Sequence, residues 1–77
     1  MTLPIKSLDQ LNLNQKAEVS HVHTEDRQML KKIIAMGVLS KAEVVLVQKF
    51  PSFVFRVDNS FFAIDKELAS CIYVKSF

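Results

Sequence analysis

The densest hydrophobic pattern in the chain is a helical period in its first half. Apolar residues recur at spacings of one, three, four and seven, which is typical of one face of an amphipathic helix: Met29, Leu30, Ile33, Ile34 and Met36. Thr24 is placed to cap this helix, and Glu25 and Asp26 put negative charge on its first turn, where the helix dipole favours it. The pattern predicts one helix over about residues 25–36.

A glycine and a short apolar run follow this helix. Gly37 is the only glycine in the chain, and it stands where a left-handed residue closes a helix. Val38 is placed to touch Ile33 as the hydrophobic partner of a Schellman-type stop. Residues 44–47, VVLV, are too short and too β-branched for another helix, so they predict a buried strand.

Shorter alternating stretches predict the remaining strands. With residues 44–47 the expected set is five short strands, the others being residues 16–24, 53–57, 61–64 and 71–75. Residues 3–5 are expected to be an extended lead-in, because Pro4 disfavours helix in the residue before it. Strands this short leave exposed edges unless the sheet closes. The expected fold class is therefore mainly β, a small five-stranded barrel with one α-helix inserted after the first strand.

The same pattern predicts local features between these elements. A bulge is expected at residues 20–21, because Val22 is out of phase with Val19 on the first strand. Asn59 is expected to be the left-handed residue of the central hairpin turn. Asp65 is expected to cap a single helical turn before the last strand.

The size and charge of the chain restrict its function. At 77 residues it is expected to be one domain, residues 1–77, which hides roughly 60% of its unfolded surface and has little room for a deep catalytic cleft. Ten basic and eight acidic residues leave a net charge of +2, and the basic residues are scattered, so nucleic acid is not an expected partner. The single Cys71 cannot form an internal disulfide, which favours a reducing cytoplasm. No signal peptide or bilayer-length apolar run is recognised, so no membrane insertion is expected.

Four groups of packing and turn residues occur along the chain. In chain order they are Leu8 and Leu11 followed by Ala17 and Val19; Leu30, Gly37, Val38 and Val44; Pro51; and Ala63, Ile64, Leu68, Ala69, Ile72 and Val74. Their order and spacing resemble those of the FeoA family, small SH3-like barrels associated with bacterial ferrous iron uptake. Three of the family's usual glycine positions hold Asn14, Lys41 and Asn59. Lys41 stands where a Pro-Gly turn is usual, so that turn must adopt another geometry or carry strain.

The resemblance implies a non-catalytic accessory role. FeoA proteins are thought to act at the cytoplasmic side of FeoB, a membrane ferrous iron transporter with a GTP-hydrolysing domain. The chain is then expected to dock on a FeoB-type transporter and to modulate its assembly or its GTPase activity. Related domains also occur at the C-terminus of metal-dependent repressors, but no helix-turn-helix precedes this one.

The phenylalanines around the central hairpin are the candidate docking surface. A barrel this small cannot easily bury all of Phe50, Phe53, Phe55, Phe61 and Phe62, and an exposed apolar patch often marks a docking site. Phe50 and Phe53, on either side of Pro51, are the expected partner-binding contacts. Lys49 and Arg56 are the expected charged rim. The alternative is that these rings seal the barrel.

Two histidines are weak candidates for a metal site. His21 and His23 lie two apart on a predicted strand, so their imidazoles can point to the same side. A metal site needs more ligands, and Cys71 is the only soft candidate. Ordinary surface histidines are the expected outcome, with no metal, no cofactor and no catalytic residue.

Two other functions stay open from the sequence. A nucleic-acid-binding or regulatory small β-barrel would need basic residues with interleaved aromatics, and Lys49, Phe53, Phe55 and Arg56 are a thin version of that pattern. A small enzyme or an iron carrier would need an acid–base pair or a ligand set beyond two histidines. Self-association also stays open, because the sequence does not define the oligomeric state.

Overall fold

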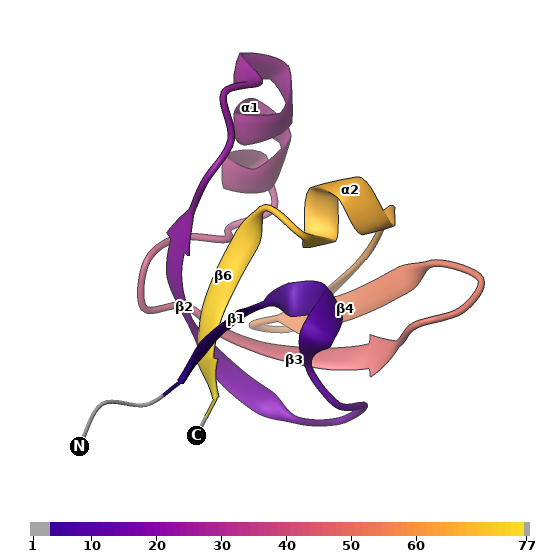
Figure 1. The fold of residues 1–77 in the computed structure, drawn as a ribbon. Coiled ribbons are helices and arrows are strands. Elements are labelled where there is room, and N and C mark those ends of the chain that lie inside the picture. Colours follow the sequence, from indigo (N-terminus) through magenta and orange to yellow (C-terminus); the bar gives the residue numbers. More distant parts are fainter. Residues whose placement is uncertain (1–3, 77) are drawn as a thin grey trace.

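The computed structural model describes residues 4–76, which form a strongly curved antiparallel sheet with helices α1 and α2 at one end (Figure 1). The strands are β1 (Ile5–Ser7), β2 (Lys16–Val22), β3 (Glu43–Gln48), β4 (Phe53–Val57), β5 (Ser60–Ile64) and β6 (Ile72–Ser76). The helices are α1 (Arg27–Ala35) and α2 (Lys66–Ala69), and a 3-10 turn, η1 (Leu8–Gln10), follows β1. The strand order is β1-β6-β2-β3-β4-β5. The expected mainly β class and the inserted helix are confirmed.

The described residues form a six-stranded sheet, with one strand more than expected. Of the expected lead-in, Leu3 lies outside the described residues, and Ile5 begins β1, which pairs antiparallel with β6 and places Ile5 opposite Lys75. This pairing gives hydrogen-bond partners to backbone groups along β6 that would otherwise lack them. The predicted bulge in β2 is confirmed, because its register with β6 shifts between Val19 and His21.

The start of α1 differs from the prediction. The helix begins at Arg27, and its N-cap is Asp26 rather than Thr24. The Asp26 carboxylate accepts hydrogen bonds from the N–H groups of Gln28 and Met29, at 2.9 and 3.2 Å. The Thr24 hydroxyl accepts one from the Asp26 N–H, so it orders the residue before the helix. Asp26 is the cap because its carboxylate satisfies N–H groups that the first helical turn leaves without partners.

The end of α1 is the predicted Schellman stop. Gly37 has a φ of +82°, and its N–H donates to the Ile34 carbonyl at 2.9 Å. The Val38 N–H donates to the Ile33 carbonyl at 3.3 Å, and both of these side chains lie in the core. Glycine suits this position because a left-handed backbone crowds any Cβ.

Three non-glycine residues also have positive φ: Asn14 (64°), Lys41 (74°) and Asp58 (55°). The prediction of Asn59 as the left-handed residue of the β4–β5 hairpin is wrong, because Asp58 takes that conformation. The two-residue turn places positive φ on its first residue, and aspartate tolerates this conformation much as asparagine does. Lys41 has no such tolerance, so its turn carries backbone strain.

Lys41→Gly is expected to raise the free energy of unfolding by about 0.5–1 kcal/mol. A left-handed non-glycine residue costs about 1–2 kcal/mol, and the greater freedom of glycine in the unfolded chain offsets part of the gain. The backbone hydrogen bond from the Lys41 N–H to the Val19 carbonyl, 2.8 Å long, is kept in the variant. Urea unfolding measures the difference. Lys41→Ala keeps the strained backbone and is the control. An equal rise in the free energy of unfolding in both variants would show that the backbone at Lys41 is not strained.

The core lies inside the curve of the sheet, where the strands contribute alternate residues (Figure 1). Its largest fully buried side chains are Phe55, Leu8, Leu11, Ile33, Leu46, Ile72, Val19, Val38, Val44 and Val74. Asp65 caps α2 as predicted, its carboxylate accepting a hydrogen bond from the Leu68 N–H at 2.8 Å. Within residues 4–76, neither helix has the length and apolar character that crossing a membrane requires.

Candidate functional site

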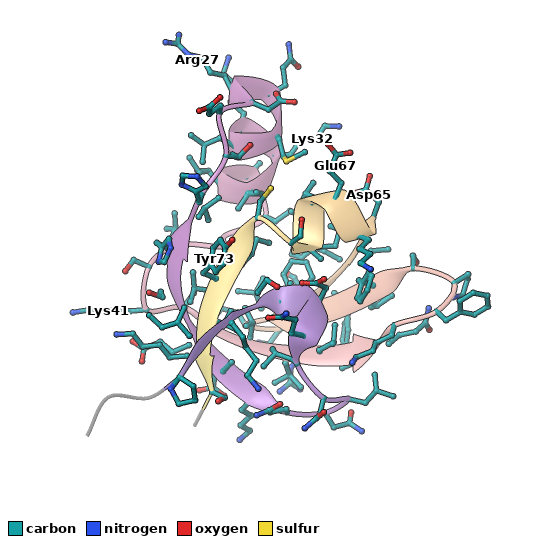
Figure 2. All side chains as sticks on the ribbon, viewed as in Figure 1. Arg27, Lys32, Lys41, Asp65, Glu67 and Tyr73 are labelled. Carbon is teal, nitrogen blue, oxygen red and sulfur yellow. The ribbon has the colours of Figure 1, made fainter. Side chains whose placement is uncertain are left out.

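The loop between β3 and β4, residues 49–52, carries the most exposed phenylalanine of the described residues. The Phe50 side chain is 86% exposed, so the expectation that it faces solvent is confirmed. Lys49 beside it is also exposed. The loop projects at the right of Figure 1, on the side of the sheet away from the turn that carries Lys41 (Figure 2).

The four residues chosen from the sequence as a partner-binding surface do not lie together. Phe53 is half-buried and packs against the core, so its expected exposure is wrong. Arg56 lies on the face of β4 opposite to that of Phe53, because successive side chains of a strand alternate between faces. Only Lys49 and Phe50 share the exposed loop.

Phe61 is the exposed aromatic that the sequence interpretation missed. Its side chain is 62% exposed, whereas Phe62 packs against the core and Phe55 is fully buried. Phe61 lies opposite Arg56 across the β4–β5 ladder, so it shares the outward face of that residue. The signal that could have found it is the two-residue turn, which sets the hairpin register once its position is known.

Arg56 lines a polar hollow on the outer face of β3 and β4. The hollow has a volume of about 220 Å³ and is lined by Glu43, Val45, Arg56 and Asp58. Arg56 therefore shares this hollow with two carboxylate side chains and does not lie beside the loop that carries Lys49 and Phe50. The pattern considered for nucleic-acid binding, Lys49, Phe53, Phe55 and Arg56, does not form one surface. Phe53 and Arg56 lie on opposite faces of β4, and the Phe55 ring is buried and cannot stack on a base.

The histidine candidates lie at the end of β2 and make contacts of ordinary surface residues. The His21 ring stacks on Tyr73, with centroids 4.9 Å apart and an interplanar angle of 11°, and its Nδ1 lies 3.0 Å from the Ser20 hydroxyl. The backbone N–H of His23 donates a hydrogen bond to the backbone carbonyl of Cys71 at 2.9 Å. In the part of the chain that the structure describes, no three His, Cys, Asp or Glu side chains are grouped as a metal site would require.

A second concave surface lies between α1 and α2. This groove has a volume of about 390 Å³ and is lined by Lys32, Ala35, Met36, Ala63, Ile64, Asp65 and Leu68. Figure 2 shows Lys32 on α1 and Asp65 at the start of α2, on facing sides of the groove. Its apolar lining suits an apolar side chain. No sequence signal marks the groove, because its two sides come from segments that are far apart in the chain.

A family model described as the FeoA domain matches residues 6–76. The chain belongs to the FeoA family. The resemblance carried by its packing and turn residues is therefore confirmed, and the match includes the Phe50 loop and the groove. A comparison with curated protein sequences gave no match.

Solved structures share this fold at low sequence identity. A crystal structure of an iron uptake regulatory protein, FeoA, has a TM-score of 0.88 at 21% identity, covering 97% of this chain and 100% of that one. The zinc complex of FeoA from Stenotrophomonas maltophilia, described as an SH3-domain protein, has a TM-score of 0.78 at 25% identity, covering 90% and 88%. A manganese-dependent transcriptional repressor has a TM-score of 0.87 at 19% identity, and this chain, covered in full, spans 44% of the repressor. The expected SH3-like fold is confirmed.

Proposed function

We propose that this chain is a non-catalytic, cytoplasmic accessory protein of ferrous iron uptake. In this role it docks on the cytoplasmic side of a FeoB-type transporter and modulates its assembly or its GTPase activity. Membership of the FeoA family over residues 6–76 carries the proposal. The Stenotrophomonas maltophilia protein, put forward as a ferrous iron transport activating factor, supports the same process.

The Phe50 loop is the contact that we propose for docking. A phenylalanine that is 86% exposed leaves nearly its whole ring in water, and a protein contact would remove that apolar surface from solvent. Aromatic side chains often dominate the free energy of association when a partner encloses them. Lys49 supplies positive charge beside the ring, which suits an acidic rim on the partner.

Affinity capture with the purified FeoB-type transporter from the same genome tests this proposal. The wild-type chain is expected to retain the transporter, and Phe50→Ser is expected to weaken retention about tenfold or more, because it removes a central aromatic contact. Leu39→Ser is the matched control, since Leu39 is 55% exposed and stands two residues before Lys41, which lies on the side of the sheet away from the Phe50 loop (Figure 2). Phe53→Ser is unsuitable because it would also damage the core.

The outcomes separate the role from the surface. If the wild-type chain neither retains the transporter nor changes its rate of GTP hydrolysis, the accessory role is wrong. If Phe50→Ser retains it as well as wild type, the role stands and the loop is not the contact. Ala35→Glu, which places a charge in the groove between α1 and α2, then identifies whether the groove is the contact.

A further inference from the structure

The two edges of the sheet are protected to very different degrees. The edge strand β1 is only three residues long, contains Lys6 and follows Pro4, features that discourage pairing with another strand. The other edge strand, β5, has five residues, SFFAI, with neither a charge nor a proline. Among residues 4–76, the only strand that pairs with β5 is β4. The second side of β5 is thus a regular, uncharged strand edge.

The hairpin register identifies which backbone groups this edge presents. Val57 and Ser60 flank the two-residue turn and form a hydrogen-bonded pair. Hydrogen-bonded and non-hydrogen-bonded pairs alternate along an antiparallel ladder. Phe61 and Ala63 therefore occupy non-hydrogen-bonded positions opposite β4, and their N–H and C=O groups point away from it. These groups are available to a further strand.

We propose that β5 pairs antiparallel with β5 of a second copy of this chain, around a two-fold axis at Phe62. In this register Phe61 of each copy lies opposite Ala63 of the other, so the outward backbone groups of both residues are paired. A register centred on Phe61 would place Ala63 opposite Asn59 in the turn, and one centred on Ala63 would place Phe61 opposite Asp65, the N-cap of α2. The register centred on Phe62 is the one that uses the whole edge.

The side chains of β5 fit this register as well as its backbone does. Phe61 is 62% exposed and Ala63 is small and exposed, so each Phe61 ring has room to cover Ala63 of the other copy. The same register brings Asp58 of one copy alongside Lys66 of the other, at both ends of the interface. Both residues are exposed, and their opposite charges favour this arrangement. Since the contact is one short strand, we expect a reversible, concentration-dependent dimer.

Sedimentation velocity over roughly 1 μM to 1 mM protein tests the dimer. Phe61→Lys, which places a charge on the edge, is expected to weaken dimerisation tenfold or more. Ile5→Lys is the matched control, because Ile5 is a 48% exposed apolar residue on the opposite edge strand and its replacement is expected to have no effect. Far-UV circular dichroism confirms that each variant is folded.

A wild-type chain that stays monomeric over the whole concentration range would overturn the proposal. The β5 edge would then be open only to a strand of a different protein. Equal weakening by Ile5→Lys would also overturn it. The register is tested by disulfide formation on a Cys71→Ser background, where Phe61→Cys is expected to cross-link faster with Ala63→Cys than with itself. Self-linking of Phe61→Cys at the same rate would exclude the register centred on Phe62. None of these outcomes depends on the transporter contact.

Discussion

Phe55→Ala is expected to lower the free energy of unfolding by about 3–5 kcal/mol. Phe55 is fully buried, lies opposite Leu46 on one neighbouring strand and Phe62 on the other, and its ring centroid is 5.9 Å from that of Phe62. Removing the ring loses this packing and leaves a cavity that the strands cannot fully close. Because small domains are stable by only about 5–15 kcal/mol, the variant is expected to be close to unfolding at room temperature. Urea unfolding followed by circular dichroism measures the change.

Phe50→Ala is the control for Phe55→Ala. It removes the same ring from a position that is 86% exposed, so its effect on the free energy of unfolding is expected to stay below about 1 kcal/mol. If the two variants unfold at the same urea concentration, the assignment of Phe55 to the centre of the core is wrong.

Ile33→Ala is expected to cost about 2–5 kcal/mol and to loosen α1 from the sheet. Ile33 is the only buried residue within α1, and Met29 adds partial packing from an earlier turn. Without this side chain the helix keeps its caps at Asp26 and Gly37 but loses its main contact with the core. Hydrogen exchange of the α1 amides is expected to accelerate more than exchange in β3, because the helix would open locally before the sheet unfolds.

The neighbouring isoleucine is a stringent control for this prediction. Ile34 has the same side chain and the same helix propensity, but it is 50% exposed. Ile34→Ala is expected to change the free energy of unfolding by less than about 1 kcal/mol and to leave exchange in α1 unchanged. Similar losses in Ile33→Ala and Ile34→Ala would mean that helix propensity rather than core packing holds α1.

The candidate site was only partly predictable from the sequence, and Phe53 and Phe61 show why. Strand alternation predicts that Phe53 faces inward with Phe55, yet its position two residues after Pro51 suggested a loop residue in solvent. Phe61 is the second residue of the returning strand β5, and its face depends on where the hairpin turn lies. The structure places the turn so that Phe61 lies opposite Arg56 and therefore outward.

The ends of α1 show a similar division. Gly37 closes the helix as predicted, because the chain has one glycine and only that residue adopts a left-handed backbone without crowding a Cβ. The N-cap was misplaced by two residues, because Thr24 and Asp26 are both good caps and the choice depends on which side chain reaches the free N–H groups.

The sequence by itself determined the order of the elements from β2 to β6, the stop of α1 and the cap of α2, because these follow from spacing and backbone preference over a few neighbouring residues. Only the tertiary structure decided that β1 joins β6, that α1 and α2 enclose a groove, and that β4 is the only strand within residues 4–76 that pairs with β5. Each of these features depends on segments that meet from distant parts of the chain. Local periodicity carries no information about which distant segment will be the partner, so core packing and strand pairing decide it.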